Sequence, residues 1–419
     1  MPWDKRLTST AFAGLCAADG EFCLAARHWT GGLRLEQPGR SVGVALVAGE
    51  IAAGDPDKGA PGVISLAAEA DVWAELTAAV PPRFGNDVSL MIGTGRMRLE
   101  ADRVLYAQYY PAVARAIELL RSPSAQPPPP PPKPAGTFDA PVGRYVHLDI
   151  LGQDHRIYFE EAGSGIPMLL QHTAGCHGAQ WRHLMECRAI TDHFRLIAYD
   201  LPFHGKSLPP TGAKWWASEY RLTGESLRAV PLGLAATLGL ERPVFMGCSV
   251  GGLLALDLAL RHADLFRAVI SLEGALNIPT EFASLWALWH PQIGGEYKAR
   301  LMNSLMSPTS PEALRKETSQ VYASGWPPAF LGDLYYYVVD YDLRQTAAQI
   351  DTSKVGVHIL SGEYDASGTA ELGEAAHKAI PGSTWATMSG VGHFPMSENP
   401  EALLRSLLPV LEGIRAPRE

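Results

Sequence analysis

Several features that mark large classes of protein are missing from this sequence of 419 residues. It contains no apolar run long enough to span a bilayer, so we expect no membrane-spanning segment. Its formal net charge of -9 disfavours a nucleic-acid partner and an anionic membrane surface, since both are themselves negatively charged. There is also no Gly-x-x-x-x-Gly-Lys-Ser/Thr phosphate loop, no His-Glu-x-x-His motif and no Cys-x-x-Cys pair. We therefore expect neither a metal ion nor a cofactor.

Cysteine is scarce, and its spacing indicates no disulfide framework. The five cysteines, at positions 16, 23, 176, 187 and 248, are odd in number and include no close metal-ligand pair. Such a pattern favours a reduced compartment. The apolar patch at residues 11–18 is short and no clear cleavage signature follows it, so we predict no secretory signal. The prediction is a cytoplasmic protein.

Proline marks a domain boundary. A chain of this length exceeds the usual size of one hydrophobic core, so two domains are expected. Residues 127–132 are six consecutive prolines. Polyproline forms a stiff, extended helix without core contacts, so we predict a semi-rigid linker over residues 123–136. A docking peptide for an SH3-type partner is less favoured, because Lys133 alone supplies a flanking specificity residue.

Residues 1–122, before the linker, have an α+β outline. Alternation and helical periodicity predict strands at 42–47 and 62–66, helices at 70–80 and 113–120, and a strand pair at 91–99. No grouping of serine, histidine and carboxylate there indicates catalysis. Residues 64–73 and 95–102 resemble the strand and helix order of sterol carrier protein type 2 domains. This resemblance implies a small lipid-binding or dimerising module, and hence a homodimer formed through this domain.

Residues 137–419 alternate short apolar strands with helical patterns. This alternation predicts an α/β domain with a mostly parallel, doubly wound sheet that is covered on both faces. An opening hairpin is expected at 145–151 and 156–161, with further strands at 167–172, 194–199, 244–246, 268–272, 356–360 and 385–388. The strand rhythm stops over residues 276–345, where a helical, aromatic-rich cap is predicted.

One serine lies in a turn of special geometry. Residues 247–251 read Gly-Cys-Ser-Val-Gly, between an apolar stretch at 243–246 and an apolar run at 252–260. Strand, sharp turn and helix in this order hold the Ser249 hydroxyl at the top of a parallel sheet, with glycines where strand and helix nearly touch. The pattern alone arises by chance in glycine-rich chains, so its context decides its meaning.

Two further loops supply the partners that a serine nucleophile needs, namely a base and an orienting carboxylate. Asp365 follows the strand ending at residue 360, and His393 follows the strand ending at residue 388. Both loops are at strand carboxyl ends, where open α/β sheets form their sites. We predict Ser249 as nucleophile, His393 as base and Asp365 as orienting acid. Glu273, at the end of another strand, is the alternative acid. Asp365 is preferred because its spacing to His393 is typical of this kind of fold.

Four segments together resemble the α/β-hydrolase superfamily over residues 137–419. They are the elbow at 247–251, the His-Thr-Ala-Gly loop at 172–175, the Asp-Leu-Pro-Phe-His-Gly-Lys-Ser segment at 200–207 and Gly-His-Phe at 392–394. One oxyanion donor should be the Val250 N–H, next to the nucleophile, and the resemblance assigns the second to Ala174.

The chain departs from the superfamily's pattern in two loops. Thr173 stands where the superfamily usually has glycine, and Pro202 with Phe203 where a glycine is common. His172 and His204 are expected to orient these loops rather than transfer protons. Cys248, beside the nucleophile, is expected to be a buried thiol.

The predicted cap and the triad together define a function. The aromatic residues of the cap favour an apolar or aromatic small-molecule substrate. We predict that five of them bind the substrate: Trp286, Trp289, Trp326, Phe330 and Tyr336. The resemblance implies a serine hydrolase that cleaves a carboxylic ester or lactone through an acyl-enzyme. Serine at the elbow disfavours dehalogenase and epoxide hydrolase chemistry, which use aspartate there. Alternatives are a carbon–carbon bond hydrolase or amidase on the same triad, and a non-catalytic ligand-binding protein on this fold.

Overall fold

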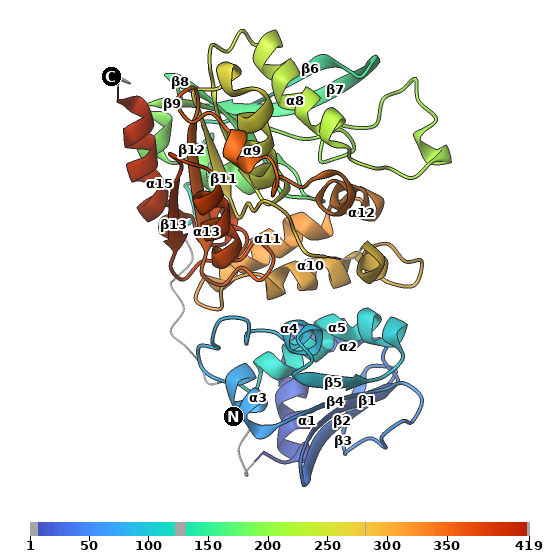
Figure 1. Cartoon of the computed structure of the whole chain (residues 1–419). Coiled ribbons are helices and arrows are strands. Elements are labelled where there is room, and N and C mark those ends of the chain that lie inside the picture. The colour runs from blue at the N-terminus through green and yellow to red at the C-terminus, as the bar shows by residue number, and fades with distance from the viewer. Residues whose placement is uncertain (1–6, 122–130, 281, 417–419) are drawn as a thin grey trace. The chain divides into compact units, whose positions relative to one another are not determined.

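The protein is described by a computed structural model that covers residues 7–121, 131–280 and 282–416 (Figure 1). Contacts divide the chain into two compact units, residues 1–126 with 290–304 and residues 127–289 with 305–419. The second piece of the first unit lies inside the predicted cap of 276–345, so that segment does not form one body. Of the predicted linker, residues 123–130 lie outside the described residues, and 131–141 contain neither helix nor strand.

The first unit is an α+β structure around a five-stranded sheet. Its strand order is β3-β2-β1-β4-β5, and only the central pair β1–β4 is parallel. The strands are β1 (Gly31–Gln37), β2 (Arg40–Val47), β3 (Glu50–Ala53), β4 (Val63–Ala68) and β5 (Met97–Glu100). The helices are α1 (Ser9–Ala18), α2 (Gly20–Ala26), α3 (Ala70–Leu76), α4 (Val88–Gly93), α5 (Arg103–Glu118) and α10 (Gly295–Ser304).

The predicted strand pair at 91–99 is wrong in its first half. Residues 88–93 form the helix α4, because the Asp87 carboxylate accepts the Ser89 N–H at 2.8 Å and so caps a helical turn. Helix α5 also begins ten residues before its predicted start, where Asp102 caps the N–H groups of Val104 and Leu105. Both errors come from helix-capping aspartates that the apolar periodicity does not reveal.

Helix α10 packs in the first unit through a buried arginine. The Arg300 guanidinium contacts Asp87 Oδ2 at 2.9 Å and Glu118 Oε1 at 2.8 Å, and its side chain is only 7% exposed. Tyr297 and Leu301 of the same helix pack against the unit's apolar core. Since a buried charge is tolerated only when it is paired, these two carboxylates hold α10 in the unit.

The second unit is built on an eight-stranded, mostly parallel sheet with helices on both faces, as the sequence predicts (Figure 1). The strand order is β13-β12-β11-β10-β8-β9-β7-β6, with β6, β7 and β9 related by antiparallel pairing. The strands are β6 (Val142–Ile150), β7 (Gln153–Ala162), β8 (Ile166–Gln171), β9 (Phe194–Tyr199), β10 (Val244–Cys248), β11 (Ala268–Leu272), β12 (Gly356–Gly362) and β13 (Thr384–Met388). Every residue of β10 and β11 is buried, which explains their continuous apolar sequence.

The sheet order determines where a site can form. After β8 the chain adds β9 on one side and β10 on the other, so the loops that follow β8 and β10 diverge at a topological switch point. Open α/β sheets bind ligands at such a crevice.

Helices of the second unit cover the sheet and form the remaining cap. They include α6 (Arg182–Met185), α7 (Arg188–Thr191), α8 (Gly224–Thr237), α9 (Val250–Arg261), α11 (Glu312–Ala323), α12 (Pro327–Tyr335), α13 (Ala370–Ala379), α14 (Pro395–Glu398) and α15 (Pro400–Arg415). A π-helical turn, η5 (Tyr336–Asp340), continues α12. Within the described ranges, no helix is both long enough and apolar enough to cross a membrane.

Candidate active site

Ser249 occupies the sharp turn between β10 and α9. Its φ is +59°, a left-handed conformation that costs a non-glycine residue roughly 1–2 kcal/mol. Its N–H donates to the Leu272 carbonyl at 2.9 Å, which holds the turn against β11. A Cβ at Gly247 would collide with the Gly251 carbonyl, so the first glycine of the motif is sterically required. Strain of this kind at a polar residue marks a functional position.

Ser249, His393 and Asp365 form a continuous hydrogen-bonded chain. The Ser249 hydroxyl donates to His393 Nε2 at 2.8 Å, and His393 Nδ1–H donates to Asp365 Oδ2 at 2.7 Å. Asp365 also accepts the backbone N–H groups of Ser367, at 2.7 Å, and Gly368, at 3.0 Å. All three side chains are buried. The fold thus brings together the three residues that the sequence selects, across up to 144 positions of chain.

Glu273, the alternative acid, takes a different place. Its Oε2 accepts the Gly362 N–H at 2.7 Å, while its residue is 1% exposed. Burial, and then the nearby charge of Asp365, raise the pKa of Glu273 well above its ordinary value. The geometry therefore selects Asp365, not Glu273, as the residue bonded to the histidine.

The loop after β8 is held by side chains on several sides. Thr173 donates its N–H and its hydroxyl to Gln180 Oε1 at 3.1 and 3.0 Å, and accepts a hydrogen bond from the Tyr322 hydroxyl. His172 Nδ1–H donates to the Thr173 carbonyl at 2.7 Å, and its Nε2 accepts the Leu201 N–H at 3.1 Å. Burial lowers the pKa of His172 well below its ordinary value, so the ring is neutral. Thr173 therefore braces the loop through contacts that a glycine could not make.

Asp333, from α12, fastens this loop to the cap. Its Oδ2 accepts the Gly175 N–H at 2.7 Å and contacts His204 Nε2 at 2.8 Å. Burial lowers the pKa of His204, but the charge of Asp333 outweighs this effect and the net shift is upward. Gly175 has a φ of +65° and lies against the Phe330 ring, where a Cβ would collide. Sequence reasoning missed Asp333, since an isolated aspartate in a helical cap carries no signal.

The nucleophile also contacts a cap tyrosine that sequence reasoning missed. The Tyr337 hydroxyl is hydrogen-bonded to Ser249 Oγ, and it accepts the Val250 backbone N–H. Burial raises the pKa of Tyr337, so the phenol stays protonated and donates to Ser249. Its neighbour Tyr336, which was predicted to bind substrate, instead donates to Asp257 of α9 at 3.3 Å. The run of three tyrosines at 335–337 could have indicated that one of them contacts the site, but only the register of the π-helical turn decides which one faces Ser249.

The predicted cap aromatics do not gather around the nucleophile. Trp326 lines a separate pocket, whereas Phe330 packs on Gly175 and near Tyr322. Trp289 is 47% exposed, and Trp286 is half-buried. Cys248 is buried as predicted, with its thiol donating to the His393 carbonyl at 3.2 Å.

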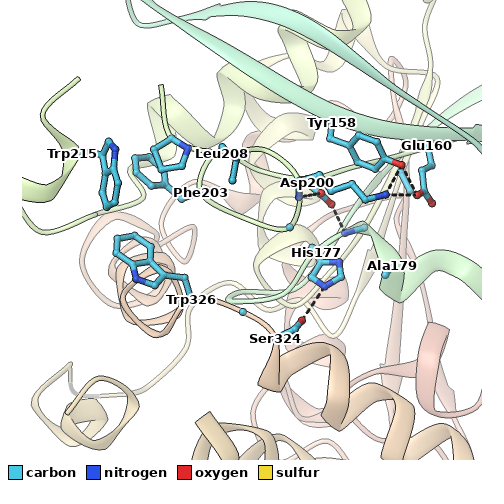
Figure 2. A pocket seen from close by; sticks show the side chains of 16 residues that line it. Tyr158, Glu160, His177, Ala179, Asp200, Phe203, Leu208, Trp215, Ser324 and Trp326 are labelled. Carbon is cyan, nitrogen blue, oxygen red and sulfur yellow. Dashed lines mark hydrogen bonds and ion pairs between the residues drawn. The ribbon is translucent and has the colours of Figure 1, made fainter. Parts of the chain in front are cut away.

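A pocket of about 750 Å³ lies beside the loop that follows β8 (Figure 2). It is lined by Tyr158, Glu160, His177, Gly178, Ala179, Ala198, Asp200, Phe203, Gly205, Lys206, Leu208, Pro209, Trp215, Ser324, Gly325 and Trp326. Neither Ser249 nor His393 belongs to this lining. Among the described residues there is no cluster of three or more side chains suited to hold a metal ion.

Comparison with known proteins identifies the family. A sequence model described as the alpha/beta hydrolase fold matches residues 166–400, more than half of the chain. The chain therefore belongs to the α/β-hydrolase family, which confirms the predicted fold class and the resemblance on which it rested.

Two curated relatives and two solved structures illustrate the similarity. A pimeloyl-(acyl-carrier protein) methyl ester esterase of Vibrio vulnificus is 22% identical over 266 residues, which are 60% of this chain and 96% of that protein. An uncharacterised protein of Mycobacterium bovis is 28% identical over 272 residues, 59% of this chain and 75% of that one. A thermophilic esterase from Thermogutta terrifontis has a TM-score of 0.57 at 21% identity, over 65% of this chain and 100% of its own. An enol-lactonase from Burkholderia xenovorans has a TM-score of 0.52 at 22% identity, over 64% of this chain and 100% of its own. At such identities the structural likeness shows the fold.

Proposed function

We propose that this α/β-hydrolase is a serine hydrolase that cleaves a carboxylic ester or lactone of an apolar or aromatic compound. The observation that carries the proposal is the unbroken hydrogen-bonded chain from Asp365 through His393 to Ser249, with Ser249 in a strained turn. A serine hydroxyl becomes a useful nucleophile only when a base accepts its proton, and here the base is already oriented. The esterase and lactonase names of similar proteins support an ester bond as the target.

The geometry supports two linked half-reactions. Ser249 Oγ attacks the carbonyl carbon while its proton passes to His393 Nε2, and the carbonyl π electrons move to oxygen. The resulting oxyanion accepts hydrogen bonds from the N–H groups of Val250 and Ala174, the two proposed donors. His393 then gives the proton to the departing alcohol oxygen, which leaves an acyl-enzyme. Water repeats the sequence and frees Ser249 and the acid. One oxyanion donor contributes roughly 2.7–4 kcal/mol to such a reaction.

The closed cap places a condition on this reaction. The Tyr337 oxygen accepts the Val250 N–H and lies within hydrogen-bonding reach of Ser249 Oγ. A substrate carbonyl oxygen needs the same Val250 N–H, and its carbonyl carbon has to approach Ser249 Oγ, beside which the phenol lies. The phenol therefore occupies the position of the substrate carbonyl, and the turn η5 has to move before a substrate can bind. Ser249 is 4% exposed, which agrees with a site that opens by cap movement.

An activity-based probe tests the proposal directly. A fluorophosphonate phosphonylates activated serines, so we expect the full-length protein to be labelled and the Ser249→Ala variant to be unlabelled. Ser353→Ala, at an exposed serine, is the matched control and should label like the parent. A panel of esters with varied acyl and alcohol groups then ranks the substrates. Labelling that persists in Ser249→Ala excludes this nucleophile, and an unlabelled parent protein favours a non-catalytic ligand-binding role.

A further inference from the structure

We propose that the pocket of Figure 2 is a second small-molecule site, distinct from Ser249, that binds a neutral aromatic compound carrying a hydroxyl or carbonyl group. Its volume of about 750 Å³ is within the range of ligand sites and admits a fused-ring molecule. No residue of the Ser249–His393–Asp365 chain lines it. Its binding function is therefore independent of the proposed hydrolysis.

One wall of the pocket consists of aromatic rings that remain open to solvent. Phe203 and Trp326 are stacked with 6.1 Å between ring centroids and 17° between planes, and Trp215 meets Trp326 edge to face at 5.7 Å. Trp215 is 37% exposed and Trp326 39%. These rings hold one another in place and leave part of their faces exposed to water. An aromatic ligand would cover that exposed apolar surface.

Phe203 adds a second, independent indication. Its φ is +72°, in the left-handed region that favours glycine, and glycine is common in this loop of α/β-hydrolases. The strained turn is held by the bond from the Phe203 N–H to the Ser207 carbonyl at 2.9 Å, and the ring rests on Tyr220 at 4.7 Å. A glycine would adopt this backbone conformation without strain, so the presence of a bulky ring indicates that the ring has a function. Because the ring lies in the pocket wall, we infer that its function is to contact the ligand.

The opposite wall is polar and carries Lys206, Glu160 and the buried Asp200 (Figure 2). Lys206 Nζ donates to the Tyr158 hydroxyl at 2.8 Å and lies 3.7 Å from Glu160, while the Tyr158 hydroxyl donates to Glu160 at 2.7 Å. His177 Nε2 and the Ser324 hydroxyl, two further groups of the lining, are 3.3 Å apart. Lys206 and Glu160 offset each other, and Asp200 is buried, accepts the N–H groups of Gly178 and Lys206, and has its pKa raised by burial. This wall therefore favours a neutral hydrogen-bonding group over a carboxylate or an amine.

The two walls together give the chemical class of the ligand. The aromatic wall receives a flat ring, and the polar wall offers hydroxyl, ammonium and carboxylate groups to one substituent. The loop that follows β8 carries Ala174 and leads into His177 of the lining, so the pocket adjoins that loop without containing Ser249.

The test uses 2-naphthol, a neutral fused-ring alcohol, titrated into the full-length protein by calorimetry and by tryptophan fluorescence. We expect saturable binding at one site, and dissociation constants at least about tenfold higher for Trp326→Ala and for Phe203→Ala. Trp216→Ala is the matched control, because Trp216 is 68% exposed beside Trp215 but does not line the pocket. It should bind as the parent does. Circular dichroism and thermal melting confirm that each variant is folded.

Two further arms separate this site from Ser249 and test its polarity. Protein whose serine has been blocked with a fluorophosphonate should bind 2-naphthol with unchanged affinity, and 2-naphthoate should bind at least about tenfold more weakly than 2-naphthol. Loss of binding on blocking Ser249, equal binding by Trp326→Ala, or no saturable binding by the parent would each overturn the proposal. A protein that binds 2-naphthol but resists labelling would retain this site and lose only the proposed hydrolase function.

Discussion

At the scale of single residues, the site separates two neighbouring acids by their environment. Asp365 accepts two backbone N–H groups and the His393 Nδ1–H, whereas Glu273 accepts the Gly362 N–H and is held neutral by burial and by Asp365. Asp365 thus receives three hydrogen bonds where Glu273 receives one, and burial opposes the charged form of Glu273. The two neighbouring carboxyl groups therefore lie in different environments.

We expect Asp365→Asn to lower kcat by about 10⁴-fold, because the amide would hold His393 in the wrong tautomer. Glu273→Gln should change kcat by less than about tenfold, since the amide oxygen still accepts the Gly362 N–H. The measurement is steady-state kinetics on the best ester of the panel. The opposite order of effects would transfer the orienting role to Glu273.

The raised pKa of Glu273 also predicts how stability depends on pH. Below its ordinary pKa both the folded and the unfolded chain hold this proton, so the folded state carries no penalty there. As the pH rises, the unfolded chain releases the proton first, and stability falls until the folded pKa is passed. The slope reaches at most about 1.4 kcal/mol per pH unit.

The Glu273→Gln substitution removes this ionisation. As the pH rises from about 5 to about 8, the melting temperature of the variant should therefore fall less than that of the parent protein. Melting curves recorded across this range give the measurement. Glu401→Gln, at an exposed position, provides the control and should follow the parent. Parallel curves for Glu273→Gln and the parent would contradict the assignment of a neutral Glu273.

At the scale of elements, the turn η5 brings a cap tyrosine into contact with the nucleophile. A π-helical turn shifts the register of the side chains that follow α12, so that Tyr336 faces Asp257 while Tyr337 faces Ser249. Two more contacts, from Tyr322 to Thr173 and from Asp333 to Gly175, fasten the cap to the loop after β8. The same loop supplies a proposed oxyanion donor, so we expect a shift of the cap to alter the oxyanion geometry.

We expect Tyr337→Phe to react faster than the parent protein with a small fluorophosphonate and with small esters. The variant lacks two hydrogen bonds that hold the closed state, and each contributes about 0.5–1.5 kcal/mol. An increase of about tenfold in kcat/KM and in the labelling rate is the expected result. Tyr336→Phe is the neighbouring control, which should affect stability more than rate because its hydroxyl bonds Asp257. A large loss of kcat in Tyr337→Phe would instead make this phenol a required donor.

At the scale of the whole molecule, the chain passes from the second unit into the first at residue 290 and returns after residue 304. Helix α10 belongs to the first unit through Arg300, yet it is followed directly by Leu305, whose carbonyl accepts the His393 N–H at 3.0 Å. The chain thus connects a buried ion cluster of the first unit to the loop of the proposed base. For the first unit itself, the lipid-binding or dimerising role suggested by its resemblance to sterol carrier domains stays a prediction.

A chain that begins at residue 135 tests this connection. It lacks Asp87 and Glu118, so Arg300 loses both partners, and we expect a lower melting temperature and an altered oligomeric state. In the full-length protein, Arg300→Ala should cost about 3–5 kcal/mol, because it leaves Asp87 buried without its cation. In the shortened chain the same substitution should have little effect. Thermal melting and light scattering provide the measurements, and equal effects of Arg300→Ala in both chains would contradict the coupling.

The sequence by itself determined the fold of the second unit, Ser249 and His393, and it limited the orienting acid to Asp365 or Glu273. It could do so because these signals are local: apolar strands, a glycine-bounded turn at Ser249, and polar residues just after strand ends, in an order typical of the family. Strand parallelism then brings such loops to one edge of the sheet, whatever the intervening sequence.

Only the tertiary structure decided which acid His393 contacts, which tyrosine reaches Ser249 and where α10 packs. Asp365 and Glu273 both follow strand ends, and Tyr336 and Tyr337 are adjacent, so local pattern cannot separate them. Arg300 finds its carboxylates 213 and 182 positions away along the chain, beyond any periodicity in the sequence. Such choices depend on side-chain register and on the pairing of buried charge, which exist only once the chain is folded.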